Sequence, residues 1–505
     1  MKKNVILIET DQQRYDCLGC NDNPYIKTPN IDALAADGTV FTRHIAANPV
    51  CQPSRCSLFT GLYPPGHGVY TNGIALNRNE YINSHNADGL IFEPLTMADA
   101  FAKEGYATAS FGKLHLTPNI EYDSREHKCP VYPESYGEMA KEEFRDWHGP
   151  YYGFDYVDFT AGHGEIPALY GHYAFWLKDT APELHKEVYP YGNPYHTKAK
   201  PEDRLKLPLE TIGDLYPSKI PSELHNTTWL ADRFVSYLNE ERPKDKPFFT
   251  YVGFPDPHHP YTPSYDIMEQ FEGCEVKPSH DPESKGMEGH PSGRKPGAVD
   301  DEFLRYTYAM MYQVDMAVGK IVEAVKAAGL YDETIFVFTS DHGDFLGDHG
   351  LQTKAQFGSH ALLNVPFVMR VPGSDLPARC DAPMSNVDVM PTLLSCAGCD
   401  TSNLDVHGID ITQAMGETSR QVYAYAGNCD KDSFNYTVYD ERYRYTWFPD
   451  SNDWDELFDH QSDIGESTNL ASKSEYRELI GKFRASIKDA LFEHNHPMVG
   501  RITNF

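Results

Sequence analysis

The amino-acid sequence predicts an α/β fold, in which a large, mostly parallel β-sheet lies between helices and a smaller antiparallel subdomain follows at the C-terminal end. Apolar runs over residues 5–8 and 334–339 indicate strands that are buried on both faces. Between such runs, apolar residues recur at helical spacing, as over residues 303–328, which is typical of crossover helices in a parallel sheet. After Gly398 the pattern changes to short tyrosine-rich segments, which indicate antiparallel strands.

Several predicted helices carry a start or a stop signal. The segment at Asn30 begins with an N-cap residue, and the segment at Pro94 has proline near its start. Glycine follows the helical pattern at Gly38, Gly61 and Gly105. In chain order we expect helices over residues 30–37, 54–60, 94–105, 227–238, 303–328, 387–397 and 475–492. We expect strands over residues 5–8, 106–111, 247–254, 334–339, 366–371, 422–426, 436–439 and 443–448.

A chain of 505 residues is too long for one simple core, so we expect two domains. Residues 1–398 are assigned to the large α/β domain, and residues 399–505 to a C-terminal α+β subdomain. Within the large domain, residues from about 119 to 225 are rich in Tyr, Pro, His and Gly and show little periodicity. A stretch of this length without clear elements usually covers a functional site, so we interpret it as an insertion.

Composition limits the partners of the protein. A formal net charge of −30 argues against nucleic acid and anionic membranes, both of which bind basic patches. No stretch approaches the ~20 apolar residues of a membrane span. The apolar run after Met1 is too short for a signal peptide and ends at Glu9, so we expect a cytoplasmic protein. An anionic substrate would need local cations, and the sequence leaves a homo-oligomer open.

The ten cysteines show no disulfide framework. Two Cys-x-x-Cys pairs, Cys17 with Cys20 and Cys396 with Cys399, lie far apart and lack histidines at zinc spacing. A joint metal or redox site at these pairs is therefore not favoured.

Cys51 differs from the other cysteines in its setting. Pro49 and Pro53 restrict the backbone on both sides of it, and a short helix follows. Cys51 would lie at the helix N-terminus, where backbone N–H groups attract anions, with Arg55 in the first turn beside it. A phosphatase loop of the Cys-x5-Arg type would need arginine where Ser57 stands. Taken alone, Cys51 fits a buried apolar residue about equally well.

Potential metal ligands follow two of the predicted buried strands. Asp11 and Gln12 follow the first strand, and Asp341 and His342 follow the strand at residues 334–339. Because ligands bind at the carboxyl ends of strands in open α/β sheets, we expect the two pairs to meet. Carboxylate and amide oxygens with one imidazole suit a divalent ion such as Ca²⁺, Mg²⁺ or Mn²⁺.

Cationic or basic residues follow two other predicted strands, and one more lies on a loop. Lys113 and His115 follow the strand at residues 106–111, His258 and His259 follow the strand at residues 247–254, and Lys354 lies on the loop. Each alone is more often a surface residue or one satisfied by hydrogen bonds. Together with Arg55 they indicate an anion pocket beside a metal ion.

The segment from Cys51 to Gly61, with Cys-x-Pro-Ser-Arg at its start, resembles the signature of the formylglycine-dependent sulfatases of the alkaline phosphatase superfamily. The resemblance spans nearly the whole chain. Asp11-Gln12 is similar to the first metal pair of choline sulfatases and phosphonate monoester hydrolases, whereas sulfatases commonly have Asp-Asn where Asp341-His342 stands. Further family motifs are matched by Gly112-Lys113-Leu114-His115, His258, Lys354, Asp388-Val-Met-Pro-Thr-Leu-Leu and Glu456-Leu-Phe-Asp…Asn469-Leu-Ala.

The resemblance implies an alkaline phosphatase-like fold and an arylsulfatase-like sulfuric ester hydrolase acting on a small-molecule or carbohydrate sulfate ester. It implies that a maturation enzyme oxidises Cys51 to formylglycine, whose hydrated aldehyde is a geminal diol. It also implies one divalent ion, with Ca²⁺ preferred over Mn²⁺ or Mg²⁺. The implied metal ligands are Asp11, Gln12, Asp341, His342 and the side chain derived from Cys51.

The resemblance also assigns roles around the ester. Arg55, Lys113 and Lys354 would hold its oxygens and offset the charge that develops on them. His258 would protonate the leaving alcohol, and His115 would help the second hydroxyl of the diol to expel sulfate. Asn72 is a weaker candidate for contacting the ester oxygens, because capping of a turn explains this residue equally well.

Two alternatives stay open. A phosphonate monoester or phosphate diester hydrolase of the same superfamily would also carry the Asp-Gln, Asp-His and Cys-x-Pro features, although Lys113 and His115 favour sulfate. A binding protein in which Cys51 is never modified is the other alternative, and the presence of all expected site residues argues against it. The sequence does not identify the sulfate ester.

Overall fold

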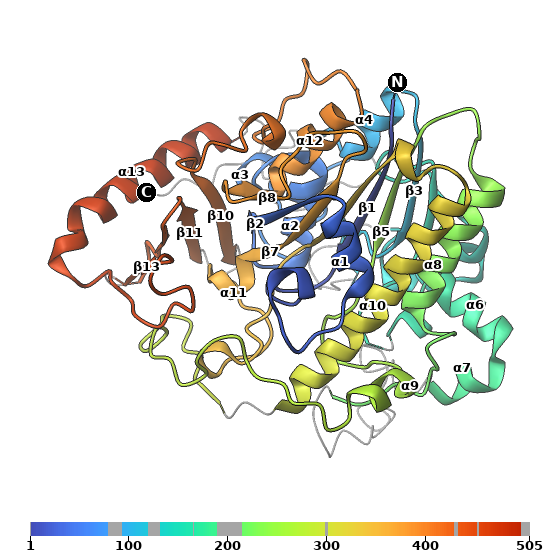
Figure 1. The fold of residues 1–505 in the computed structure, drawn as a ribbon, viewed down its shortest axis with the longest axis horizontal. Helices are drawn as coiled ribbons and strands as arrows, with labels where there is room; N and C mark the ends of the chain where they lie inside the picture. Colours follow the sequence, from blue (N-terminus) through green and yellow to red (C-terminus); the bar gives the residue numbers. More distant parts are fainter. Residues whose placement is uncertain are drawn as a thin grey trace, which may run out of the picture.

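The computed structural model describes residues 2–78, 93–119, 132–164, 166–188, 215–297, 301–428, 433–451 and 454–495. These residues form a large mixed sheet with helices on both faces and a separate antiparallel sheet (Figure 1). The predicted fold class is therefore confirmed.

The large sheet has the strand order β4-β3-β5-β1-β6-β7-β2-β8, and β9 pairs with β2. Its strands are β1 (Asn4–Thr10), β2 (Thr39–Ile45), β3 (Ala107–Gly112), β4 (Tyr156–Phe159), β5 (Phe248–Gly253), β6 (Thr334–Ser340), β7 (Asn364–Arg370), β8 (Arg379–Cys380) and β9 (Met384–Ser385). The pairings are parallel except those of β7, which runs antiparallel to β6 and β2. Every residue of the central strand β1 is buried, as expected for a strand covered on both faces.

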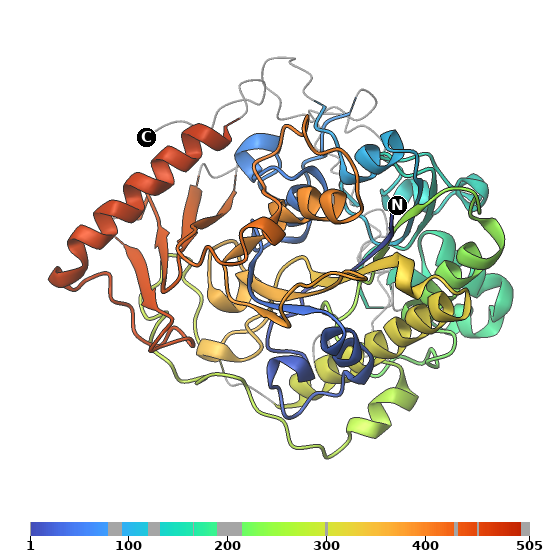
Figure 2. The same ribbon diagram turned by 45° about the horizontal axis from the view of Figure 1, so that its top comes forward.

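Helices form a layer on each face of this sheet (Figure 2). Because side chains alternate along β1, Ile6 and Ile8 enter one core and Val5 and Leu7 enter the other. The first core includes residues of α1 (Pro29–Ala36), α8 (Asn226–Ser236) and α10 (Asp301–Ala327). The second includes residues of α2 (Cys51–Thr60), α4 (Met97–Lys103) and α12 (Val389–Cys396). Further helices are α3 (Pro64–His67), α5 (Tyr136–Met139), α6 (His172–Thr180), α7 (Pro182–Val188), α9 (Tyr265–Met268) and α11 (His360–Leu363).

The segment from 119 to 225 contains regular structure that its sequence did not show. β4 lies at the edge of the large sheet, where Tyr156 pairs with Ala109 and Phe159 with Gly112 in parallel. The helices α6 and α7 follow it. The strand is only four residues long, too short for alternation to stand out from its aromatic surroundings. Residues 120–131, 165 and 189–214 of this segment lie outside the described residues.

The second sheet has the antiparallel order β10-β11-β12-β13. Its strands are β10 (Val422–Asn428), β11 (Ser433–Tyr439), β12 (Tyr443–Trp447) and β13 (Asp455–Asp459), and α13 (Arg477–His494) lies along it at the left of Figure 1. Phe483 and Ile487 of α13 share a core with Tyr445 of β12. The domain boundary after residue 398 stays a prediction, since Ile411 and Ala414 beyond it are buried in the α12 core of the large sheet.

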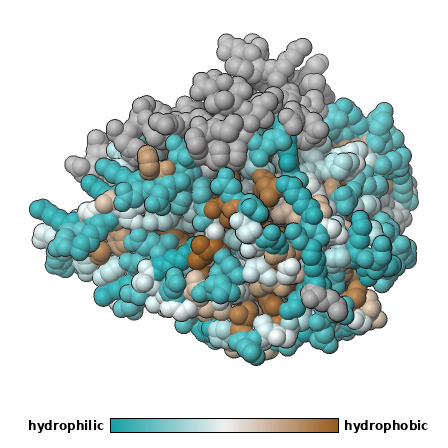
Figure 3. All heavy atoms as spheres, turned by 90° about the horizontal axis from the view of Figure 1, so that it is seen from above, coloured by the Kyte–Doolittle hydropathy of each residue, from teal (hydrophilic) through white to brown (hydrophobic). Residues whose placement is uncertain are grey.

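None of the helices in the described part of the chain is both long enough and apolar enough to span a membrane. Where the surface is described, the face seen in Figure 3 is mainly hydrophilic, and its apolar side chains lie in small groups between polar ones.

A buried arginine connects the second sheet to the large domain. Arg444 of β12 is fully buried, and its guanidinium contacts Glu456 at 3.0 Å and binds Glu466 with two nitrogens. It also donates to the carbonyl of Gly358, while Glu466 accepts from the backbone of His360 in the large domain. Two buried carboxylates thus share one buried cation.

We predict that Arg444→Met lowers the free energy of unfolding by about 3–5 kcal/mol, because it leaves buried carboxylates without their counter-charge. Thermal and urea denaturation measure this loss. Arg442→Met is the matched control, since the side chain of Arg442 is 44% exposed where it pairs with Asp459, so its loss should shift the unfolding midpoint little. Equal shifts from the two variants would contradict the role of Arg444.

Candidate active site

Four adjacent strands deliver the predicted site residues to one edge of the large sheet. In the order β3-β5-β1-β6, the strands are followed by Lys113, His258, Asp11 and Asp341. Thr10 of β1 lies opposite Ser340 of β6, so the next residues, Asp11 and Asp341, are neighbours. The sequence expectation that these strand ends meet is confirmed.

Four potential metal ligands converge at this edge. Ligand atoms of Asp11, Cys51, Asp341 and His342 all lie within 4.8 Å of one another, and all four residues are buried. His342 Nε2 lies 3.6 Å from Asp11 Oδ1 and 3.7 Å from Asp341 Oδ1. The other ring nitrogen, Nδ1, is 2.8 Å from the carbonyl of Gly343, which orients Nε2 toward the carboxylates.

Gln12 is held so that its amide oxygen stays available. Its Nε2 donates to Asp344 Oδ2 at 2.5 Å, and Asp344 also accepts from the hydroxyl of Tyr261 at 2.7 Å. The Oε1 atom of Gln12 is buried and has no hydrogen-bond partner among the described residues. A buried acceptor without a donor is costly, so this oxygen suits a cation.

Cys51 is the first residue of α2 and is almost completely buried. Its Sγ lies 2.9 Å from Lys354 Nζ, 3.2 Å from His342 Nε2 and 3.6 Å from Asp11 Oδ1. Burial and Asp11 oppose ionisation of the thiol, but Lys113, Lys354 and His342 outweigh them and lower the pKa of Cys51. The predicted helix-N-terminal cysteine beside cations is therefore present.

Arg55 is fully buried beneath the metal ligands rather than open to a substrate. Its Nε donates to Asp341 Oδ2 at 2.8 Å, and its terminal nitrogens lie 3.3 Å from Asp11 Oδ2 and 3.1 Å from Glu9 Oε2. The hydroxyl of Tyr251 is 2.6 Å from the guanidinium as well. These contacts direct Arg55 toward the carboxylates, so its predicted contact with ester oxygens stays a prediction.

Asn72 shows the capping role that the sequence left open. Its Oδ1 accepts the backbone N–H of Gln52, at 3.0 Å, in the first turn of α2. The residue is exposed, and its predicted contact with a substrate stays untested.

Lys113 lies in the site directly after β3, which ends at Gly112. Lys113 Nζ lies 2.5 Å from Asp11 Oδ2. His115 has a φ of 57°, so the chain turns there and the strand alternation ends. The backbone N–H of His115 donates to Glu134. Burial and Lys113 hold the pKa of the His115 imidazole well below the usual value. No hydrogen bond among the described residues joins His115 to Cys51.

His258 and Lys354 form a hydrogen-bonded pair. His258 Nε2 is 2.5 Å from Lys354 Nζ, and its Nδ1 contacts the carbonyl of His259. Because burial, His163 and Lys354 hold the pKa of His258 well below the usual value, its ring is neutral and Nε2 accepts from the lysine.

Three residues of the site were not predicted from the sequence. Glu9 is the last residue but one of β1. Burial raises the pKa of its carboxyl to about 7, because it outweighs the opposite effect of Arg55. Tyr251 of β5 donates to Glu9 Oε2 at 2.5 Å. Both could have been noticed as polar groups inside buried strands. His163, whose Nε2 is 3.2 Å from Lys113 Nζ, comes from the unpatterned segment and left no sequence signal.

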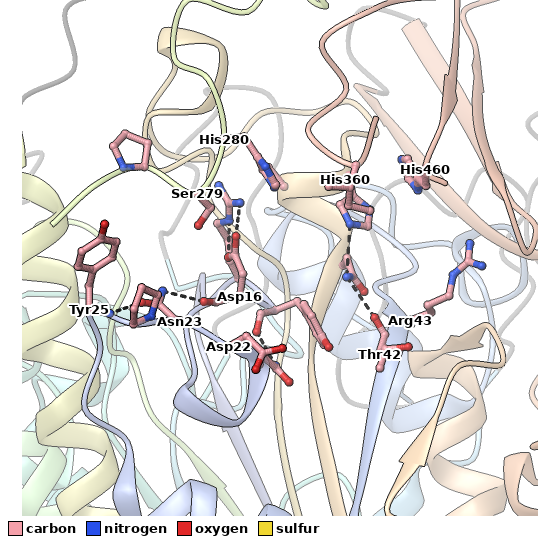
Figure 4. A pocket seen from close by; sticks show the side chains of 18 of the residues that line it. Asp16, Asp22, Asn23, Tyr25, Thr42, Arg43, Ser279, His280, His360 and His460 are labelled. Carbon is pink, nitrogen blue, oxygen red and sulfur yellow. Dashed lines mark hydrogen bonds and ion pairs between the residues drawn. The ribbon is translucent and has the colours of Figure 1, made fainter. Parts of the chain in front are cut away.

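A cavity of about 630 Å³ lies beside this site without containing it (Figure 4). Its wall includes Arg14 and Ala361, and both contact Gly343, the residue after the metal-ligand candidate His342. The labelled histidines His280 and His360 lie along one side of the cavity in Figure 4. Cys51 is not among the residues that line this cavity.

The cysteine pairs noted in the sequence do not form disulfides. Cys17, Cys20, Cys396 and Cys399 are free thiols, as are the other cysteines in the described ranges.

Comparison with known proteins agrees with this geometry. The family model described as Sulfatase matches residues 3–399, and the model for the C-terminal part of N-sulphoglucosamine sulphohydrolase matches residues 347–492. An arylsulfatase of Clostridium perfringens is 27% identical over 96% of this chain and 93% of its own length. An ulvan-active sulfatase of Formosa agariphila is 26% identical over 97% of this chain and 81% of its own length.

Among solved structures, the phosphonate monoester hydrolase of Agrobacterium radiobacter has the same fold, with a TM-score of 0.70 and 24% identity over 98% of this chain and 96% of that chain. The first family model covers well over half of the sequence, and the chain covers most of the length of the two sulfatase relatives. The chain therefore belongs to the sulfatase family, within the alkaline phosphatase-like superfamily, and is a sulfuric ester hydrolase.

Proposed function

We propose that the protein hydrolyses sulfate monoesters of small molecules or carbohydrates, with a formylglycine derived from Cys51 as nucleophile and one bound divalent ion. The observation that carries this proposal is the position of Cys51 Sγ, which lies 2.9 Å from Lys354 Nζ and 3.2 Å from His342 Nε2. The names of sulfatase relatives support it: one is described as an arylsulfatase and another as an ulvan-active sulfatase.

The residues present fit a divalent ion. Asp11 and Asp341 supply carboxylate oxygens, His342 supplies one nitrogen, and Gln12 has a buried oxygen without a partner. This donor set suits Ca²⁺, with Mn²⁺ or Mg²⁺ as alternatives. When bound, the ion supplies positive charge that stabilises an ionised hydroxyl beside it.

Formylglycine fits the position of Cys51 for a chemical reason. A maturation enzyme would oxidise the thiol to an aldehyde, and hydration would place two hydroxyls on the same carbon. One hydroxyl attacks sulfur and the other later expels sulfate, whereas an unmodified cysteine would need a separate attack by water. His115 is buried near this end of the sheet, and we assign it the proton of the second hydroxyl.

Cations around Cys51 would stabilise the sulfuryl group in transit. Lys113 and Lys354 have ammonium groups at the site, and removing one such donor typically lowers the rate by about 10²–10³-fold. Arg55 contributes by holding Asp11 and Asp341 in place. The pair of His258 and Lys354 supplies the proton that the leaving oxygen takes as the S–O bond breaks.

A phosphonate monoester or phosphate diester hydrolase remains the second candidate. It is favoured by the fold likeness to phosphonate monoester hydrolases, by Gln12 and by His342. Charge does not separate the candidates, because sulfate monoesters and phosphate diesters each carry one negative charge. The presence of both Lys113 and His115 favours sulfate.

We predict that Cys51 is formylglycine in an active preparation. Peptide mass spectrometry should show the mass loss that accompanies conversion of the thiol to an aldehyde. Cys51→Ala should abolish turnover, because the nucleophile is gone. Cys56→Ala is the matched control: this buried cysteine of the same helix packs in the core, so turnover should persist. A fully active sample that contains only unmodified Cys51 would refute the mechanism.

We predict one tightly bound divalent ion per chain. Asp341→Asn should reduce the metal content measured by elemental mass spectrometry, because it removes a charged ligand. Asp348→Asn is the control, since this buried carboxylate pairs with Arg14 outside the ligand set. If Asp11→Ala and Asp341→Ala both retain full metal content, the ligand assignment is wrong.

Parallel kinetics decide between the two candidate functions. Protein produced with its maturation enzyme should hydrolyse an aryl sulfate with higher kcat/KM than the matching phosphate diester or phosphonate monoester. The matching leaving group makes the comparison depend on the transferred group alone. Much faster turnover of the diester or phosphonate would replace the first proposal with the second.

A further inference from the structure

His163 reaches the active site from the insertion between β4 and α6. It lies in a turn with Gly162 and Gly164, which have φ angles of 76° and 60°. A Cβ atom on Gly164 would lie 3.3 Å from the ring of Pro260. The turn therefore packs closely on the loop that carries His258, and glycine permits both the backbone conformation and the close approach.

The imidazole of His163 lies flat against the imidazole of His258. The ring centroids are 3.4 Å apart and the planes differ by 10°. His258 is also held at its two nitrogens, by Lys354 and by the carbonyl of His259. A flat ring against its face restricts the remaining freedom, which is rotation of the His258 ring out of its plane.

The edge of His163 contacts Lys113. His163 Nε2 is 3.2 Å from Lys113 Nζ, and a lysine ammonium has only donors, so Nε2 is the acceptor. Another N–H of Lys113 points to Asp11 Oδ2, 2.5 Å away. With two of its three N–H groups held in this way, the direction of the third is set.

We propose that His163 is a positioning residue with two separable actions: its face holds His258 in line with Lys354 for protonation of the leaving oxygen, and its Nε2 aims Lys113 at the transferred group. The inference rests on the proposed function, which gives His258 and Lys113 these roles. As the S–O bond breaks, its electron pair stays on the leaving oxygen, which takes a proton from the Lys354 ammonium that His258 Nε2 holds in place. His163 itself touches neither the proton nor the ester.

The two actions can be separated by substitution. His163→Phe keeps an aromatic face against His258 but removes the acceptor for Lys113. His163→Gln removes the ring but offers an amide oxygen to Lys113. His163→Ala removes both.

The leaving group of the substrate provides the readout. A nitrophenolate leaves readily without a proton, whereas an alkoxide requires one, so only an alkyl sulfate depends strongly on the general acid. We expect His163→Gln and His163→Ala to lower kcat/KM for an alkyl sulfate at least about tenfold more than for 4-nitrophenyl sulfate, since general acid catalysis contributes 10²–10⁴-fold. His163→Phe should lower kcat/KM for both substrates by the same factor, up to about 10²-fold.

A control variant and the unfolding midpoint separate this role from a general loss of structure. His185→Phe changes a histidine of α7 in the same insertion, whose Nε2 lies 3.1 Å from the carbonyl of Ala168. This variant should leave kcat/KM for both substrates unchanged. The inference would be overturned if all three variants of His163 lowered kcat/KM for the alkyl sulfate and for 4-nitrophenyl sulfate by equal factors. Wild-type kinetics in all three variants would overturn it as well.

Failure of the proposed function gives a different result. If the wild-type protein prefers phosphate diesters, the sulfatase assignment fails, and the same comparison is made with a nitrophenyl and an alkyl phosphate diester. The readout is the ratio of kcat/KM for the nitrophenyl ester to that for the alkyl ester. If this ratio changes in His163→Gln but not in His163→Phe, the positioning role is supported for either class of substrate. If the ratio is the same in the two variants, the positioning role is overturned.

Discussion

The contact of Arg55 with the carboxylates at the centre of the large sheet is the interaction on which the site depends. Asp11 and Asp341 directly follow neighbouring strands and would repel each other in a buried setting. Arg55 lies between them, fully buried, and burial raises the pKa of the Glu9 carboxyl beneath it to about 7. Removing a buried charge from such a cluster is far more costly than losing a surface pair. The arginine thus makes a pair of buried carboxylates compatible with a stable fold.

The charges above this arginine explain how an acidic protein can bind an anion. The chain has a net charge of −30, which repels anionic esters at long range. Within the site, Lys113 contacts Asp11, and Lys354 contacts the Cys51 thiol, whose pKa is lowered. The lysines therefore largely offset the carboxylates, and a divalent ion would supply the excess positive charge. Affinity for the substrate is expected to come from close contacts in a water-poor site rather than from long-range attraction.

Segments distant in sequence hold these groups in place. The insertion contributes β4 to the sheet and His163 to the site, so it is part of the framework of the large domain. The second sheet is bound to the large domain through Arg444 and Glu466, which also contacts the backbone of His360. The cavity of Figure 4 is lined by residues of the large domain, such as Arg14 and His360, and by residues next to strands of the second sheet, such as Glu441 and His460. Cys51 is not among its lining residues.

The sequence by itself determined the fold class, the buried strands and the residues that follow them, because strong apolar runs and helix stop signals act locally. It also indicated that Asp11 and Asp341 meet, since parallel strands present their carboxyl ends at one edge. The tertiary structure alone decided three points. Arg55 faces carboxylates because the register of β1 and β6 places them around it, His115 turns away from the strand direction, and His163 enters from a segment without periodicity. These depend on contacts between residues far apart in the chain, which no local pattern encodes.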